Sequence, residues 1–312
     1  MDRRRNGVLA LIATLLAASA VWNVQMAVAR APWSPHATKA ADREAAKRRS
    51  RGRRMLKHGP RATSVSAPAL TWSDEFNGSA GGPPNPSKWS VIYGGGGFGN
   101  DELQYYTSNS NNLAVDGAGH LVITAVSGSY TGSDGVTRNY TSGAIQTKGL
   151  FQARYGTLDA RIEIPQGQGL WPAFWAVGSN TDSVGWPQCG EIDMMENLGN
   201  DPFTIYGSIH GPQSGVANGY AITTTKHSHV SLAGGFHVYG VTWSPNKLVF
   251  TLDGAAYATY TPKSLSPTQQ WVFNKPFFLI LNLAVGGSWP GSPNATTTFP
   301  AKMLVDWVRV YS

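Results

Sequence analysis

One short stretch of the 312-residue chain carries three carboxylates within six positions, at Glu191, Asp193 and Glu196. In a β-strand, side chains alternate between two faces, so Glu191 and Asp193 share one face and Glu196 falls on the other. That second face also carries Ile192, and an unpaired carboxylate in an apolar layer costs several kcal/mol. One extra residue at Met194-Met195, a β-bulge, returns Glu196 to the side of the other two acids. The sequence therefore predicts a bulged strand with three carboxylates on one open face.

Spacing alone leaves two interpretations of this strand open. One is a solvated acidic edge or a structural cation site. The other is a pair of carboxylates for glycoside hydrolysis, with Asp193 between them. Retaining glycosidases hold their two carboxyl groups about 5–5.5 Å apart, whereas five strand positions span on the order of 15 Å. Catalysis therefore requires the bulge and a concave sheet to tilt Glu191 and Glu196 toward each other.

The rest of the sequence after residue 67 is typical of β-structure. It is rich in Gly, Trp, Tyr, Thr and Val and has few helical periods. Short alternating runs recur at 121–124, 236–243, 248–252 and 303–311, and Asp253-Gly254 favours a tight hairpin turn. The pattern predicts that residues 68–312 form one all-β sandwich domain of jelly-roll type.

Residues 1–67 are expected to lie outside that domain. Three arginines at positions 3–5 precede an apolar run over about residues 7–21 and two small-x-small sites. This layout predicts a secretory signal peptide over residues 1–29 and a secreted, extracellular protein. The alternative is a protein anchored in a membrane through residues 7–29. Once the signal is removed, no stable membrane insertion is expected.

Residues 30–67 are interpreted as a basic, disordered linker. This segment has a net charge of +9 and residues 1–29 add +2, so the whole-chain charge of +7 leaves −4 for residues 68–312. Because the excess of basic residues lies outside the predicted domain, nucleic acid is not expected as a partner.

The single cysteine, Cys189, excludes an intrachain disulfide. It shares strand parity with Glu191, so we expect its thiol to line the same face. No base close in sequence supports a nucleophilic role for it, and no group of His, Cys and Asp has the spacing of a zinc site.

Aromatic residues add a second signal upstream of the acidic strand. Trp171 and Trp175 would share a strand face about 13 Å apart, and flat indoles at such spacing suit the apolar faces of successive sugar rings. Packing in the core is the alternative for either residue. Farther along, a strand places His210 beside Tyr206 and Ser208, and Asn282 is the one amide in an apolar run. Such residues are as often structural as functional.

Several stretches in this order resemble glycoside hydrolase family 16, and in particular its laminarinase-like endo-β-1,3-glucanases. The resemblance covers about residues 70–312 and rests on the segments 72–77, 99–107, 169–175, 191–196, 207–210 and 306–311. It departs at Ser288, where relatives often carry Asn before the tryptophan that corresponds to Trp289.

The resemblance implies a concanavalin-like jelly roll with a substrate cleft across its concave face. It implies Glu191 as nucleophile, Glu196 as general acid/base and Asp193 as the residue that sets their ionisation. Substrate binding is assigned to Asn100, Trp171, Trp175, His210, Asn282 and Trp289. No cofactor is implied for catalysis, but many relatives hold a structural calcium, for which the matching groups are Glu75, Gly119 and Asp306.

The function expected from the residues and the resemblance together is retaining hydrolysis of β-1,3-glucan by a secreted endo-glycosidase, using double displacement. The alternatives are a mixed-linkage β-1,3-1,4-glucanase and a non-catalytic glucan-binding module of the same fold. A polysaccharide is thus the expected partner, and the protein is expected to be a monomer.

The linker interpretation predicts that brief proteolysis of the secreted protein removes residues 30–67 without loss of glycosidase activity. Mass spectrometry of the digest and an activity assay on the same sample measure both quantities. Protection of the segment from protease would contradict the interpretation, because it would indicate a folded or bound tail.

Overall fold

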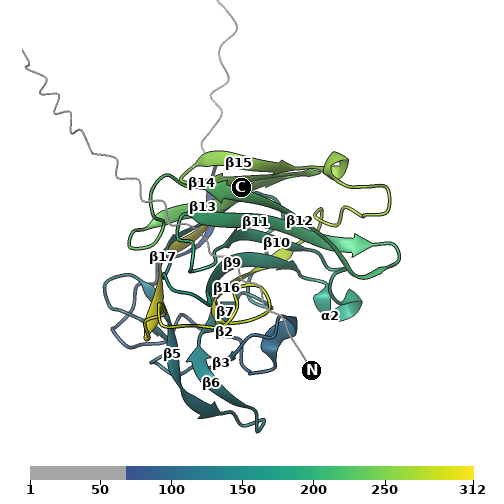
Figure 1. The fold of residues 1–312 in the computed structure, drawn as a ribbon. Coiled ribbons are helices and arrows are strands. Elements are labelled where there is room, and N and C mark those ends of the chain that lie inside the picture. Colours follow the sequence, from purple (N-terminus) through teal and green to yellow (C-terminus); the bar gives the residue numbers. More distant parts are fainter. Residues whose placement is uncertain (1–67) are drawn as a thin grey trace, which may run out of the picture. The chain divides into compact units, whose positions relative to one another are not determined.

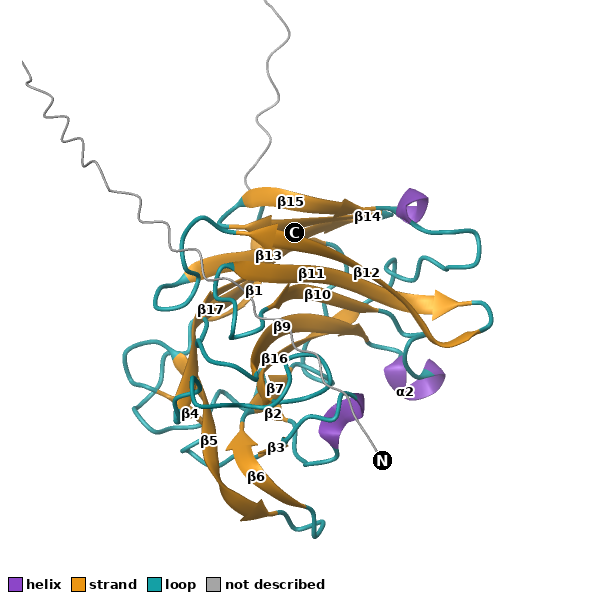
Figure 2. Cartoon of the chain, in the orientation of Figure 1, coloured by secondary structure: helices purple, strands orange, loops and turns teal. Residues whose placement is uncertain are grey.

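The computed structural model describes residues 68–312 (Figures 1 and 2), so the predicted signal peptide and linker lie outside the described residues. Nearly all of the regular structure in this part of the chain consists of strands. None of the helices that it contains is long and apolar enough to cross a membrane.

The larger of two sheets has ten strands, eight of them in the order β15-β14-β13-β8-β17-β5-β6-β3, with β1 beside β17 and β4 beside β5. The strands are β1 (Leu70–Asp74), β3 (Gln104–Tyr106), β4 (Leu113–Val115), β5 (Leu121–Thr131), β6 (Thr137–Ser142), β8 (Gly156–Glu163), β13 (His237–Ser244), β14 (Lys247–Leu252), β15 (Ala255–Tyr260) and β17 (Ala301–Tyr311).

The smaller sheet has seven strands in the order β12-β11-β10-β9-β16-β7-β2. They are β2 (Ser90–Val91), β7 (Ala144–Gln146), β9 (Leu170–Gly178), β10 (Glu191–Glu196), β11 (Thr204–Gln213), β12 (Val216–His227) and β16 (Phe277–Val285). One-turn helices interrupt the loops: η1 (Gly97–Gly99), α2 (Thr181–Val184) and η2 (Pro262–Ser264). Figure 1 shows β12, β11, β10, β9 and β16 side by side.

The two sheets bury one apolar face each against the other. In β8, Leu158, Ala160 and Ile162 are fully buried and alternate with partly exposed polar residues. In β16, Leu281 and Leu283 are fully buried on either side of the half-buried Asn282. Full burial of one such aliphatic side chain contributes about 1.5–3 kcal/mol. The predicted all-β sandwich is confirmed.

The alternating runs read from the sequence correspond to strands β5, β13, β14 and β17. The hairpin between β14 and β15 turns at Asp253 and Gly254, whose φ angles are 50° and 75°. Positive φ at both central residues is what a type I′ hairpin turn requires, which is why an Asp-Gly pair is favoured there. Strand β10, which carries the three acids, lies between β9 and β11, so both neighbours contribute side chains to its open face.

Candidate active site

The bulge predicted in β10 is present. Against β9, Asp193 pairs with Trp175 and Glu196 pairs with Ala173, so three steps along β10 match two along β9. The same mismatch occurs against β11, where the partners of Asp193 and Glu196 are Ser208 and Tyr206. The extra residue lets two consecutive side chains, those of Met194 and Met195, point into the core, where both are fully buried. As a result, Glu196 returns to the face that carries Glu191 and Asp193.

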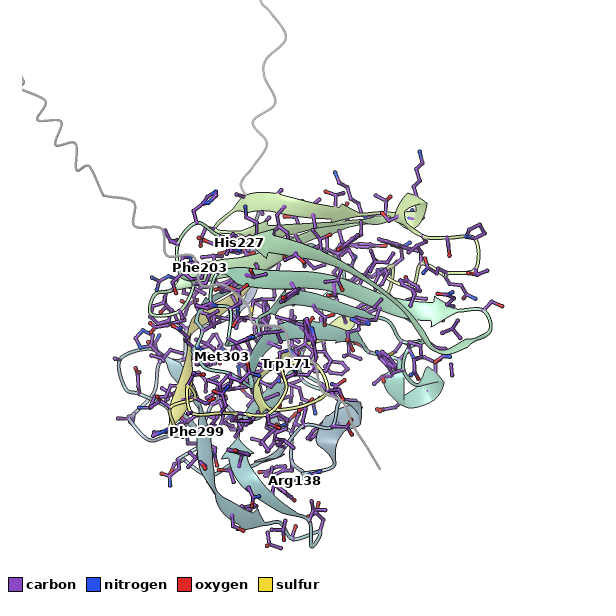
Figure 3. All side chains as sticks on the ribbon, viewed as in Figure 1. Arg138, Trp171, Phe203, His227, Phe299 and Met303 are labelled. Atoms are coloured by element: carbon purple, nitrogen blue, oxygen red, sulfur yellow. The ribbon has the colours of Figure 1, made fainter. Side chains whose placement is uncertain are left out.

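That face is the floor of a cleft of about 730 Å³. All three carboxylates line it, and so does every residue for which substrate binding was predicted, namely Asn100, Trp171, Trp175, His210, Asn282 and Trp289. Figure 3 labels Trp171, which lies near the middle of the smaller sheet. The structure therefore brings the predicted catalytic and binding residues together in one cavity.

Indole N–H groups donate hydrogen bonds to the two outer carboxylates. Trp171 Nε1 donates to Glu196 Oε1 at 3.1 Å, and Trp186 Nε1 donates to Glu191 Oε2 at 3.1 Å. Ser208 Oγ lies 3.5 Å from Glu196 Oε2 as a second, longer donor. Each outer carboxylate thus has one oxygen bound by an indole and keeps access to the cleft.

Asp193, between them, is only 3% exposed. His210 Nε2 lies 3.0 Å from Asp193 Oδ2 and 3.6 Å from Glu191 Oε1. The imidazole is not aligned for a hydrogen bond to Asp193 Oδ2, and no other donor within residues 68–312 reaches this buried oxygen. His210 therefore acts on the carboxylates through its charge when protonated.

The shared environment raises the pKa of all three acids. Burial is the main cause for each, and for Glu191 and Glu196 the charge of Asp193 adds to it. For Glu196 the pKa rises to about 8, although His210 and the hydrogen bonds from Trp171 and Ser208 lower it. Three buried carboxyls this close titrate as a coupled group and do not all carry charge at neutral pH.

Aromatic rings form the cleft wall on the Glu196 side. Trp289 packs edge-to-face against Trp171, with ring centroids 5.3 Å apart, and against Tyr206 at 4.8 Å. Trp289 nevertheless remains 43% exposed. On the other flank of β9, Trp175 Nε1 donates to Asn282 Oδ1 at 2.7 Å. The two tryptophans predicted as platforms are thus cleft residues, anchored by their N–H groups.

Sequence reasoning left several residues that line the cleft unassigned, among them Glu102, Tyr106, Trp186 and Ser208. A signal existed for Ser208, which shares a strand face with His210. Trp186 lies in the loop after α2, and its N–H reaches Glu191 only because that loop folds back over β10. Glu102 and Tyr106 belong to a polar, aromatic loop whose contacts depend on β16, which is far away in the sequence.

The expectation for Cys189 was wrong. Its side chain is fully buried in a small apolar cluster with Val177, Phe278 and Ile280, and burial raises its thiol pKa. Val177 and Ile280 line the cleft, so the thiol is covered by cleft residues and does not line the cleft itself. Strand parity could not predict this, because β10 begins only at Glu191, after Gly190 with φ 74°.

The residues predicted to hold calcium have other partners. Both carboxylate oxygens of Glu75 accept from Arg309, at 3.0 and 2.7 Å, and Asp306 is paired with Arg161. A methyl group placed on Gly119 would lie 3.7 Å from Asn77 Oδ1 and 3.9 Å from the Glu75 carbonyl oxygen. Oxygen atoms that could bind a cation are therefore near Gly119. Arginines, however, already pair with the carboxylates of Glu75 and Asp306, so these side chains do not form a free anionic site. Calcium stays a prediction.

Comparison with known proteins identifies relatives of this chain. The family model for glycosyl hydrolases family 16 matches residues 100–309. A beta-glucanase from Rhodothermus marinus is 37% identical over 252 residues, which cover 78% of this chain and 84% of that protein. The chain spans only 34% and 39% of two longer curated relatives.

Solved structures give the same result. The endo-beta-1,3-glucanase from Pyrococcus furiosus has 46% identity and a TM-score of 0.72, covering 78% of this chain and 94% of that one. The laminarinase catalytic domain from Thermotoga maritima MSB8 has 40% identity and a TM-score of 0.72, with coverage of 78% and 98%.

The bulge predicts unequal effects of changing its length. Deletion of Met195 leaves Glu-Ile-Asp-Met-Glu, in which a regular strand already places all three acids on one face, so only one buried side chain is lost, at about 2–5 kcal/mol. Insertion of alanine after Met195 forces the bulge to absorb two residues or sends Glu196 into the core, which costs more. Urea denaturation of both variants measures the difference. An insertion variant as stable as the deletion variant would contradict this account of the strand.

The raised pKa of Glu196 predicts a pH-dependent stability. Between its ordinary value of 4.5 and about 8, the folded chain keeps a proton on this carboxyl that the unfolded chain has lost. The free energy of unfolding should therefore fall as the pH rises through this window. Glu196→Gln has no such proton to lose, so its stability relative to wild type should grow from pH 5 to pH 8. Denaturation curves at four pH values test this, and equal slopes for the two proteins would contradict the raised pKa.

Proposed function

Because the chain belongs to glycosyl hydrolases family 16, we propose that it hydrolyses internal linkages of β-1,3-glucan with retention of anomeric configuration. The observation that carries this proposal is the bulge in β10, which places Glu191 and Glu196 on the floor of one cleft. The names of the relatives support the substrate class, since they include endo-β-1,3-glucanases and a laminarinase.

In the first step, Glu196 acts as general acid and Glu191 as nucleophile. With a pKa of about 8, the Glu196 carboxyl is protonated at neutral pH and can give its proton to the glycosidic oxygen that leaves. A carboxylate oxygen of Glu191 attacks the anomeric carbon from the opposite side, so the carbon–oxygen bond to the leaving sugar breaks as the glycosyl–enzyme ester forms. The Trp186 N–H bound to the other oxygen of Glu191 helps this residue to carry negative charge.

In the second step, Glu196 is a carboxylate and acts as general base. It takes a proton from water, whose oxygen attacks the anomeric carbon and displaces Glu191. Two inversions restore the starting configuration, and Glu196 is again protonated. The proton and the nucleophile both come from carboxyl groups, so this chemistry requires no cofactor.

Asp193 and His210 set the charge state of the pair. A negative Asp193 raises the pKa of both glutamates, whereas a protonated His210, 3.0 Å from Asp193 and 3.6 Å from Glu191, lowers it. Both effects act in the same sense on the two glutamates, so they set how many protons the coupled pair holds. Double displacement uses the state in which Glu196 holds a proton and Glu191 is charged.

The place of action is proposed from the first 29 residues, which lie outside the described part of the chain. Their basic start, apolar run and small-residue sites support export through a signal peptide. A polymeric glucan too large to enter a cell is consistent with an enzyme that acts outside it.

The test combines substitutions with product analysis. Glu191→Gln and Glu196→Gln should each reduce hydrolysis of laminarin to below a few per cent of wild type, because each removes one partner of the double displacement. Glu163→Gln, on β8 of the other sheet, is the matched control and should keep full activity. Either active-site variant with substantial remaining activity would refute its assigned role.

Two further measurements address stereochemistry and linkage. NMR of newly formed reducing ends should show the β-anomer first, and an initial α-anomer would exclude retention. Products should form from laminarin in preference to lichenan, agarose and xyloglucan. Preference for lichenan would favour the mixed-linkage alternative, and binding without products would favour the non-catalytic one.

A further inference from the structure

A fourth carboxylate, Glu102, lines the cleft but has no part in the double displacement. It precedes β3, lines the cavity and is only 6% exposed. Burial raises its pKa, although the hydrogen bonds that it accepts lower it. Burying an acid is costly unless it is paired or hydrogen-bonded, so the hydrogen bonds of Glu102 are the feature that needs explanation.

Three donors converge on Glu102. Asn100 Nδ2 donates to Oε1 at 3.2 Å, Gln104 Nε2 donates to Oε2 at 2.5 Å, and the Tyr106 hydroxyl donates to Oε2 at 3.3 Å. An ionised carboxylate accepts at both oxygens and donates nothing, so it can satisfy all three at once. An amide in its place would present its own N–H₂ to at least one of them.

The direction of these bonds determines the next two. Since the hydroxyl of Tyr106 gives its only proton to Glu102, its oxygen can only accept from the other side, where Asn282 Nδ2 donates to it at 3.0 Å. The amide of Asn282 must then turn its oxygen the opposite way, and Oδ1 accepts from Trp175 Nε1 at 2.7 Å. The donors and acceptors are thus fixed at both ends of the series, because the carboxylate can only accept and the indole N–H can only donate.

This series of four side chains, Glu102–Tyr106–Asn282–Trp175, is termed the relay below. It connects the loop before β3 with β16 and β9, and its first member is tied to β16 again because Gln104 Oε1 accepts from the Val285 N–H at 2.8 Å. Were the relay to reverse, the Asn282 amide would place its N–H₂ against the Trp175 N–H, and both donors would be unsatisfied.

We propose that Glu102 is a positioning residue: as the terminal acceptor, its carboxylate completes the relay and thereby holds the Trp175 indole at the angle at which it supports a sugar ring. The inference rests on the proposed function, because it takes Trp175 as a sugar platform beside Asp193, its register partner on β10. In this role Glu102 acts through Trp175 and not on the reacting atoms.

A double-mutant cycle tests the proposal. Glu102→Gln should raise KM on laminarin about fivefold, the effect of one lost buried hydrogen bond, while kcat stays within about twofold. Trp175→Phe keeps an aromatic ring but ends the relay. In that background, Glu102→Gln should cause no further rise in KM, because residues that act through one another are coupled. A full additional rise would overturn the proposal and indicate that Glu102 contacts the sugar directly.

A second variant tests the relay even if Glu102→Gln does not fold. Tyr106→Phe removes the middle hydroxyl and should reproduce the KM effect of Glu102→Gln. Tyr220→Phe is its matched control, because it removes another buried tyrosine hydrogen bond, the 3.1 Å bond to the Gln270 carbonyl oxygen, and should leave KM unchanged. An equal rise in KM for this control would show that the KM effects come from general destabilisation of the fold, and it would overturn the proposal.

A readout without substrate separates this inference from the proposed function. Near-ultraviolet circular dichroism of Glu102→Gln should differ from that of wild type, and the difference should vanish when both proteins carry Trp175→Phe. If wild type fails to cleave laminarin yet this spectral coupling is present, the proposed function fails and the relay stands. If wild type is active but the spectral change persists without Trp175, the relay fails and the proposed function stands.

Discussion

The site depends on one extra residue in the backbone of β10. Without it, Glu191 and Glu196 would point to opposite faces of the sheet, and one of them would be buried in the core. The bulge also puts two consecutive side chains into that core, and methionine suits such a position because its flexible, unbranched chain fills irregular space. Both methionines are fully buried. The same local irregularity therefore assembles the acids and is stabilised by packing behind them.

Placing three carboxyls on this face costs stability, and the neighbouring strands limit that cost. Indole N–H groups from Trp171 and Trp186 bind one oxygen of each outer acid, and His210 Nε2 lies 3.0 Å from Asp193 Oδ2. These contacts do not return the pKa values to their ordinary range, because burial is the larger effect. The residual destabilisation is functional, since it keeps a proton available on a carboxyl near neutral pH.

What the sequence could predict is what alternation along a strand determines. Parity placed Trp171 and Trp175 on one strand face, and an odd separation of two glutamates required the bulge. The substrate-binding assignments of His210 and Asn282 came from the family resemblance. Alternation of side chains predicts the face of a residue only within a strand, and not beyond the strand's ends. Cys189 precedes a glycine at which β10 has not yet begun, and its thiol is buried and does not line the cleft.

The contacts that could not be predicted are those in which loops meet strands distant in sequence. The bond from Asn282 to Tyr106 joins residues 176 positions apart, and the pairing of Asp306 with Arg161 joins residues 145 apart. No local sequence pattern indicates that Asp306 will form an ion pair with an arginine 145 positions away. Fold class and catalytic face were thus accessible from local periodicity, whereas the ionic partners of Glu75 and Asp306 required the packed chain.

The two tryptophans of β9 show how one strand serves two purposes. They are four positions apart and share a face, yet their N–H groups point to different neighbours. Trp171 reaches across to Glu196 on β10 and lowers the pKa of that carboxyl, so it belongs to the chemistry. Trp175 reaches the other way, to Asn282 on β16, and belongs to the relay that we propose positions it for a sugar ring. Because an indole has a single donor, neither tryptophan can take over the bond of the other. The hydrogen bond to the acid and the relay proposed to position the sugar platform are therefore separate, although both start from the same strand.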